Sequence, residues 1–387
     1  MRGIFVSSRR LQWAGSARLI RAVLWLMVMI SSAAASEPIT LALIVAETGL
    51  AVDDGTPARK GAEIALAEIN QAGGLLGAPL RIIQLDNRST PLGAKRAAEQ
   101  AVDLGVQGVI GAIWSSHSAP MAAVLQAARI PMITPGSTKP EITLTGDYIF
   151  RACFLDSFQG RVMARFAFSD LGCPTAAVLK NINEEYSITL GEFFSAHFEK
   201  EGGEIVYEGN YQGASVDFHD LLIETGVRRP HTIFIPGYSR DSGLLIKQAK
   251  KMRIHAVFLG GDAWDGPIED YAGTAVNGSY FSSHWHPEVD FPRSRGFMAR
   301  YRKRFGDEPI SSFAALTYDS VFLFAEAVRR AGSAETGRIR KALADTRDFK
   351  GVTGPISFNA NGDPLDKKVS ILKFENGSRH FMRSIGP

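Results

Sequence analysis

Small hydroxyl side chains follow two apolar runs in the first half of this 387-residue sequence. The residues that come directly after the runs are Trp114, Ser115 and Ser116 after 108–113, and Gly136, Ser137 and Thr138 after 130–134. In open α/β sheets, ligands bind beyond the carboxyl ends of the strands, next to helix N-termini. Unpaired N–H groups and hydroxyls at such a place favour an anion. This half of the sequence therefore predicts a site for a carboxylate.

Aromatic and acidic side chains follow the apolar runs of the second half. They are Tyr186 after 176–180, Tyr238 after 232–237, and Asp262 and Trp264 after 256–261. Ring faces and a carboxylate suit an ammonium group, through cation–π contact and ion pairing. Both halves together predict a cleft that holds a small zwitterion.

Each of these residues also has a simpler interpretation. A serine or threonine after a strand is commonly part of a turn or a helix cap. Trp114 and Trp264 would fit equally well in a hydrophobic core, and Asp262 could cap the next helix. The functional interpretation depends on the coincidence of such residues at five strand ends.

The elements that must position these residues alternate between strand and helix. Apolar strands are expected at 39–46, 80–85, 108–113 and 130–134, and again at 176–180, 204–209, 232–237 and 256–261. Helical patterns separate them, and the pattern 56–74 would begin at Thr56 as a cap with Pro57 in its first turn. A second helix would follow the cap candidate Thr90. Strands without polar alternation, joined by helices, predict an α/β protein with two doubly wound parallel-sheet lobes that divide near 150–156.

The last third departs from this alternation. Helices are expected at about 291–305, 312–331 and 335–345, and a hairpin at 371–383 around Asn376-Gly377. Periodicity does not decide which lobe receives these helices.

The first 35 residues form a different segment. Five arginines precede the apolar run 22–30, and the small residues "SSAAAS" follow it, which is typical of a cleaved secretory signal peptide. Loss of those arginines lowers the 43 Lys and Arg residues to 38, against 40 Asp and Glu, so no nucleic-acid partner is predicted. A helix between Cys153 and Cys173 would hold them roughly 20 Å apart, so we expect two free, buried thiols.

Several longer segments resemble the type I periplasmic binding proteins of the leucine/isoleucine/valine class. They are "KGAEIALAEINQAGG", "VIGAIWSSHSAP", "ITPGSTKPEIT", "YIFRACFLDSFQG" and "FAALTYDSVFLFAEAVRRAG". The resemblance runs from about residue 38 to 384. It implies lobe 1 at 37–155 and 285–358, lobe 2 at 156–284 and 359–387, and a hinge of three crossovers. The late helices would then return to lobe 1.

The resemblance also implies roles for individual residues. The ligand's α-carboxylate would lie on Ser115, Gly136, Ser137 and Thr138, while Tyr186, Tyr238 and Asp262 come from lobe 2 and the acid receives the α-ammonium. This chain departs from the branched-chain binders where Asp54 replaces a tyrosine, Asp262 a glutamate, and Gly136 and Ser137 two alanines. Those departures indicate a more polar pocket, open to a polar amino acid, an amide or a urea-like molecule.

These patterns favour a monomeric periplasmic receptor of an ABC importer, which closes around one solute by hinge motion and docks on an inner-membrane permease. The alternative is a sensor of the same fold that feeds a signalling partner. An enzyme is disfavoured, since the sequence has no G-x-S-x-G, P-loop or H-E-x-x-H motif, and no cofactor is expected. The best metal candidate, His284-Trp285-His286, is weak, and we expect it to line the hinge or the cleft wall.

Overall fold

The computed structural model describes residues 1–5, 37–289 and 291–387. Contacts divide the chain into two units, Met1–Pro38 and Ile39–Pro387, and all the elements below belong to the second. Apart from its first five residues, the predicted signal peptide lies outside the described residues. Among the residues that are described, no helix combines the length and the apolar character needed to cross a membrane.

The first sheet has five parallel strands in the order β2-β1-β3-β4-β5. They are β1 (Ile39–Val45), β2 (Leu80–Asp86), β3 (Gly108–Gly111), β4 (Met132–Thr134) and β5 (Ile149–Arg151). The helices between them are α2 (Val52–Gln71), α3 (Pro91–Asp103), α4 (Ser115–Ala128) and α5 (Glu141–Leu144). Leu41 to Ile44 are almost fully buried, as expected for a strand covered by helices on both faces.

The second sheet has seven strands in the order β14-β13-β10-β9-β8-β6-β7. They are β6 (Thr175–Asn181), β7 (Glu204–Tyr211), β8 (Thr232–Ile235), β9 (Val257–Gly260), β10 (Tyr280–Ser283), β13 (Val369–Glu375) and β14 (Ser378–Ile385). The first five run parallel, and the hairpin β13–β14 adds an antiparallel edge. The intervening helical segments are α6 (Asp156–Arg165), a π-helical turn (Phe166–Asp170), α7 (Glu185–Lys200), α8 (His219–Val227), α9 (Ser239–Lys251), the 3-10 turn η2 (Asp262–Asp265), α10 (Ile268–Ala272) and the 3-10 turn η3 (Gly273–Val276). The predicted class of two doubly wound parallel-sheet lobes is confirmed.

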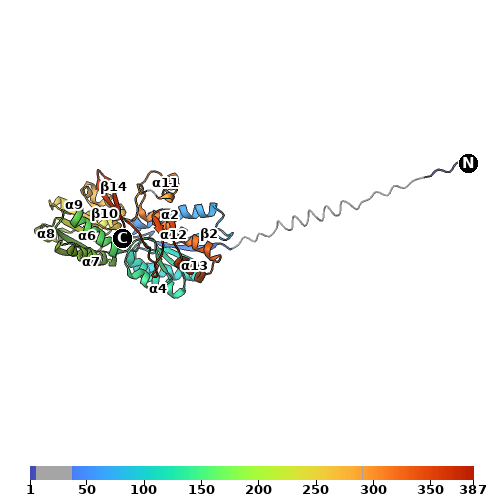
Figure 1. Cartoon of the computed structure of the whole chain (residues 1–387), viewed down its shortest axis with the longest axis horizontal. Coiled ribbons are helices and arrows are strands. Elements are labelled where there is room, and N and C mark those ends of the chain that lie inside the picture. Colours follow the sequence, from blue (N-terminus) through green and yellow to red (C-terminus); the bar gives the residue numbers. More distant parts are fainter. Residues whose placement is uncertain (6–36, 290) are drawn as a thin grey trace. The chain divides into compact units, whose positions relative to one another are not determined.

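The late helices pack on the first sheet's helices. They are α11 (Pro292–Phe305), α12 (Ser312–Ala331) and α13 (Thr336–Ala344), followed by the small hairpin β11 (Phe349–Gly351) and β12 (Gly354–Ile356). α12 packs against α2 and reaches β3 and β4. Figure 1 shows α2, α4, α12 and α13 grouped on one side, with α6, α7, α8 and α9 on the other. The chain crosses between the two groups after β5, after β10 and after β12.

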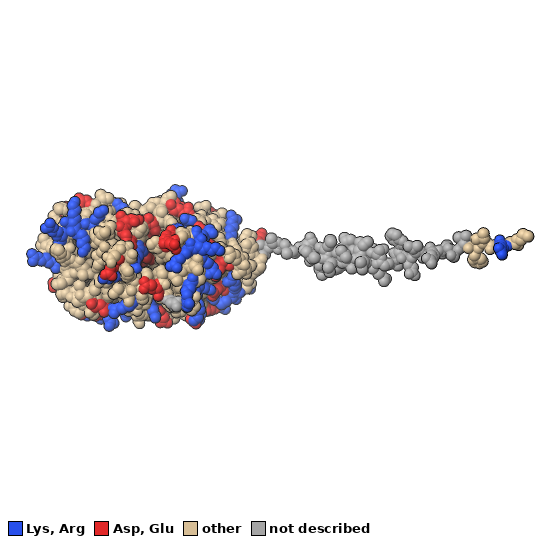
Figure 2. Space-filling view, turned by 90° about the horizontal axis from the view of Figure 1, so that it is seen from above, with Lys and Arg blue, Asp and Glu red and all other residues tan. Residues whose placement is uncertain are grey.

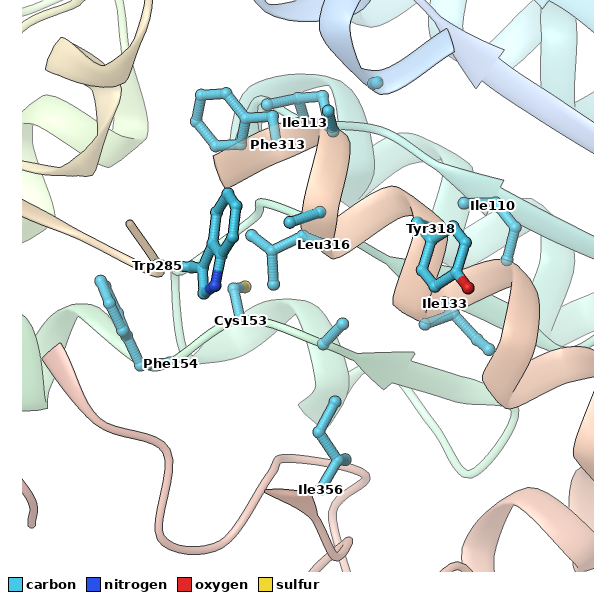
Figure 3. Packing of buried hydrophobic residues seen from close by; sticks show 14 of the residues in the cluster. Ile110, Ile113, Ile133, Cys153, Phe154, Trp285, Phe313, Leu316, Tyr318 and Ile356 are labelled. Atoms are coloured by element: carbon cyan, nitrogen blue, oxygen red, sulfur yellow. The ribbon is translucent and has the colours of Figure 1, made fainter. Parts of the chain in front are cut away.

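A continuous apolar cluster fills the region where these crossings occur. Trp285, just after β10, is almost fully buried, and its indole N–H donates to Ser294 Oγ at 3.2 Å. Figure 3 shows its ring beside Leu316 of α12 and Cys153 of the first crossing. This packing fixes the place where the two groups of elements meet.

Helix starts are the places where sequence and structure differ most. Thr56 does not cap a helix, because α2 begins at Val52 and Pro57 lies inside it. This earlier start places Asp53 and Asp54 in the first helical turn, where the positive end of the helix dipole favours carboxylates. Thr90 caps α3 as predicted, with its hydroxyl accepting from the N–H of Gly93 at 2.9 Å.

The hairpin and thiol predictions are confirmed. Asn376 and Gly377 both have positive φ, as a two-residue hairpin turn requires. Cys153 and Cys173 are free and buried. The helix predicted between them is present as α6, and it continues into a π-helical turn.

Candidate functional site

The candidate residues lie where the parallel strands of both sheets end. β3 and β4 lead to Trp114 and Gly136, while β6, β8 and β9 lead to Tyr186, Tyr238 and Asp262. Because parallel strands of one sheet end at the same edge, each sheet gathers its polar residues on one side. Contacts between the two sets show that these edges face each other.

The stacked rings of Trp114 and Tyr238 make the closest of these contacts. Their centroids lie 3.5 Å apart, with 11° between the planes. Both side chains are more than nine-tenths buried. Trp114 lies between β3 and α4 of the first group, and Tyr238 directly precedes α9 of the second. This stack therefore joins the two groups of elements across the site.

Asp54 is held beside this stack. Its Oδ2 accepts from Trp114 Nε1 at 2.7 Å, while Oδ1 has no hydrogen-bond partner within the described part of the chain. Burial raises the pKa of Asp54 to about 7, and the charges of Asp53, Asp265 and Asp262 add to this effect. A hydrogen-bond donor or a cation placed beside Oδ1 would lower the pKa of Asp54 again.

The two hydroxyl side chains in the turn after β4, Ser137 and Thr138, have different surroundings. Ser137 Oγ lies 3.1 Å from the carbonyl oxygen of Ile113 and 2.7 Å from Ser118 Oγ, so it faces the protein interior. Thr138 Oγ1 is fully buried and makes no hydrogen bond of normal geometry within the described ranges, but its hydroxyl lies near Asp156 and lowers the pKa of that carboxyl group. A Cβ on Gly136 would lie 2.9 Å from Ile113 Cγ2 and 3.1 Å from Phe313 Cε1, so glycine lets this turn pack closely.

Arg151 fixes this turn, and sequence reasoning did not identify it. Its guanidinium donates to the carbonyl oxygens of Ser137 at 2.7 Å and Pro140 at 3.0 Å, and Nε pairs with Asp363 at 2.6 Å. The "YIFRACF" segment carried the signal, since an arginine ending a buried strand must find a partner. The partner lies more than 200 residues away.

Asp262 is bonded on both carboxylate oxygens. Tyr186 Oη donates to Oδ1 at 2.8 Å, and His284 Nε2 lies 2.9 Å from Oδ2. A carboxylate has about four lone-pair positions, so Asp262 keeps the capacity to accept further hydrogen bonds. His284 also packs against Phe154, with ring centroids 3.9 Å apart, and its Nδ1 has no partner in the described part of the chain.

A short hydrogen-bonded path connects Thr138 with Asp262. The N–H of Asp156 donates to the carbonyl oxygen of Thr138 at 2.9 Å. Gln159 Nε2 donates to Asp156 Oδ1 at 3.1 Å, and Gln159 Oε1 accepts from the N–H of Asp262 at 2.8 Å. Burial, followed by repulsion from Asp262, raises the pKa of Asp156 well above its ordinary value. Neither Asp156 nor Gln159 was selected from the sequence, although both belong to the "DSFQG" segment.

The outer edge of the site is joined by polar contacts. Ser116 Oγ donates to Glu184 Oε2 at 2.8 Å, and Lys139 pairs with Glu185 at 2.5 Å. Ser115 is buried, and its Oγ accepts from the N–H of Lys139 at 3.4 Å. Burial raises the pKa of Glu184 to about 7.

Trp264 and the histidine pair lie differently from the other candidates. Trp264 is fully buried in the apolar cluster of the second sheet, with Phe258 and Phe281, so the structure does not bring it to the site. Its ring lies over Gly260, where a Cβ would meet Trp264 Cε2 at 2.1 Å. β10 ends at Ser283, so His284 and His286 do not share a strand face. Across the described ranges, no three His, Cys, Asp or Glu side chains are grouped as metal ligands.

Three buried polar atoms at this site lack a partner among the described residues: Asp54 Oδ1, Tyr238 Oη and His284 Nδ1. The side chains of Thr138 and Asp156 interact with each other, although not in a hydrogen bond of normal geometry. Buried polar groups in proteins are nearly always hydrogen-bonded. Their concentration between two lobes, around a stack of rings, makes this region the candidate binding site. The fold and the site together define a two-lobed binding protein.

Comparison with known proteins gives the same class. Residues 38–379 match the model of a family described as periplasmic binding protein, and the chain therefore belongs to that family. It is 30% identical to a leucine-, isoleucine-, valine-, threonine- and alanine-binding protein of Pseudomonas aeruginosa, over 85% of this chain and 88% of the relative.

Solved structures are also similar. A leucine binding protein LivK from Thermotoga maritima has a TM-score of 0.87 at 32% identity, covering 90% of this chain and 99% of its own. The branched-chain amino acid transporter substrate binding protein LivJ from Streptococcus pneumoniae, in complex with isoleucine, has a TM-score of 0.86 at 29% identity, covering 91% and 100%. The predicted membership of the leucine/isoleucine/valine class is confirmed.

Proposed function

We propose that this protein is the periplasmic receptor of an ABC importer, and that it binds one amino acid or a related small polar solute between its two lobes. The buried polar atoms at the junction of the lobes carry this proposal, since Asp54 Oδ1, Tyr238 Oη and His284 Nδ1 have no partner among the described residues. The relatives named for binding leucine, isoleucine, valine, threonine and alanine support the amino-acid class. Export by a signal peptide at 1–35, action as a monomer, and delivery to an inner-membrane permease complete the proposed role.

The ligand's carboxylate would bind in the first lobe. Thr138 Oγ1 is buried, and Ser115 begins α4, so these two hydroxyls and the N–H groups of Ser115 and Ser116 would donate to an anion. Gly136 lets the turn backbone approach closely. Ser137 would act by shaping the turn, since its hydroxyl is already used inside the protein.

The ligand's ammonium would bind in the second lobe. Asp262 keeps free lone pairs beside the bonds from Tyr186 and His284. The ring faces of Tyr186 and Tyr238, with centroids 5.5 Å apart, add cation–π attraction. Binding both ends would join the lobes, which is how hinge closure is coupled to a ligand.

A thermal-shift screen of amino acids, amides, ureas and short carboxylates tests this proposal. A ligand at about a hundred times its dissociation constant stabilises the folded protein by about 2.7 kcal/mol. We expect at least one α-amino acid to raise the melting temperature. A screen in which only molecules without an α-amino group stabilise the protein would contradict the amino-acid assignment.

Two variants test the two ends of the ligand separately. Thr138→Val should weaken binding by about 1–3 kcal/mol, because a ligand carboxylate loses a buried donor. Thr145→Val is the matched control, since Thr145 lies on the exposed side of the same segment. Asp262→Ala should abolish binding of α-amino ligands, because it leaves a buried ammonium unpaired; unchanged affinity, measured by calorimetry, would refute the ammonium role.

A further inference from the structure

A small cavity beside the aromatic stack carries more acidic than basic side chains. Its charged lining residues are Asp53, Asp54, Glu184, Asp241 and Arg240. Arg240 Nη1 already donates to Asp241 Oδ1 at 3.2 Å, so its guanidinium is paired. The remaining three carboxyl groups, those of Asp53, Asp54 and Glu184, have no cationic partner in this lining, so the cavity is acidic. On the face seen in Figure 2, Asp and Glu side chains gather near the middle, with Lys and Arg toward both ends.

Asp54 contributes an unused oxygen to this cavity. The residue is only 4% exposed, and its Oδ1 has no hydrogen-bond partner within the described ranges. Asp262 and Asp265, across the junction, add to the electrostatic repulsion at this carboxyl group. A buried carboxylate with one oxygen left unbonded is disfavoured, and a cation bound here would supply the missing bond and offset the repulsion.

The Trp114 ring next to this oxygen holds the carboxylate in position. Asp54 Oδ2 is fixed by the indole N–H of Trp114, so the indole edge and the carboxylate form one rigid unit. The face of Trp114 lies parallel to Tyr238, whose hydroxyl has no partner among the described residues. His117 is stacked on Trp114 as well, so a cation would be held by the carboxylate, which a planar guanidinium or an ammonium group suits.

We propose that Asp54 and Trp114 form a subsite for the cationic end of the ligand's side chain, so that the ligand is an amino acid bearing a guanidinium or ammonium group. This rests on the function proposed above, with the α-carboxylate at Ser115 and Thr138. Ser115 directly follows Trp114 in the chain, so the carboxylate site and the cation subsite lie at opposite ends of one aromatic side chain.

Closure of the lobes would complete this subsite. The cavity encloses only about 50 Å³, room for a few water molecules, so the side chain would enter while the lobes are apart. Gly266, beyond η2, lies directly against the free oxygen, since a Cβ there would be 3.0 Å from Asp54 Oδ1. The second lobe therefore lies next to this oxygen, and its backbone would have to shift to admit the cation before covering it.

Isothermal titration of matched ligand pairs tests the subsite. Arginine and citrulline have nearly the same shape but differ in charge, and lysine and norleucine differ in the same way. We expect the wild-type protein to bind the cationic member at least about tenfold more tightly. Asp54→Asn should reduce this ratio to about one with little change for the neutral member, because asparagine still accepts from Trp114.

The control is Asp103→Asn, which removes one exposed carboxylate at the end of α3 and should keep the wild-type ratio. Equal affinities of the wild-type protein for arginine and citrulline would overturn the subsite, even if Asp54→Asn failed to fold. Tighter binding of leucine than of arginine would overturn the subsite and leave the amino-acid receptor intact. Binding of no amino acid at all would refute the receptor function itself.

Discussion

The buried carboxyl group of Asp54 should make the ligand-free protein less stable as the pH rises. Burial raises its pKa from 3.8 to about 7, so the folded state keeps a proton that the unfolded state has already lost. A group of this kind contributes most stability below about pH 4, and its contribution falls as the pH rises through about 7. The full rise in pKa corresponds to roughly 4 kcal/mol.

Asp54→Asn removes this titration while keeping an acceptor for the indole N–H of Trp114. Between about pH 5 and about pH 8, the wild-type protein should lose about 3 kcal/mol more unfolding free energy than the variant. Glu184, whose pKa is also raised to about 7, is present in both proteins, so the comparison isolates Asp54.

Urea denaturation of the two ligand-free proteins over this pH range measures the difference. Asp103→Asn serves again as the charge-matched control and should follow the wild-type curve. Parallel curves for the wild type and Asp54→Asn would refute the reasoning, because they would mean that Asp54 ionises in the folded protein as freely as in the unfolded chain.

Two further predictions concern the frame of the site and its thiols. Arg151→Met should lower the free energy of unfolding by about 3–5 kcal/mol, because it leaves Asp363 buried without its partner. The double variant Arg151→Met with Asp363→Leu should recover much of this loss. Equal losses in the single and double variants would contradict the role of the pair. Burial raises the pKa of the Cys153 thiol to about 12. A thiol reagent should therefore label Cys153 in the native protein only at the rate of unfolding. Rapid labelling of the native protein would show that the site is open to solvent.

Sequence patterns predicted the fold because it depends on local signals that agree with each other. Uniformly apolar strands separated by amphipathic helices lead to parallel sheets whose ends gather polar residues at one edge. Thr90 and the Asn376-Gly377 turn could be identified because their partners lie within a few residues. The same logic selected Trp114, Thr138, Tyr186, Tyr238 and Asp262 as residues at strand ends.

Tertiary structure alone decided which of these side chains face the site. Ser137 and Thr138 are adjacent hydroxyl residues, yet Ser137 bonds to Ile113 and Ser118 while Thr138 lies near Asp156. Trp264 fills the space above Gly260 instead of the site.

The pairings of Arg151 with Asp363 and of Asp54 with Trp114 join residues 212 and 60 positions apart. Local sequence carries no signal for such contacts, because they depend on how two sheets are brought together by distant crossings of the chain. The sequence by itself therefore determined the elements and the edge where the site forms, and only the packing of the two lobes decided which atoms remain free to bind a ligand.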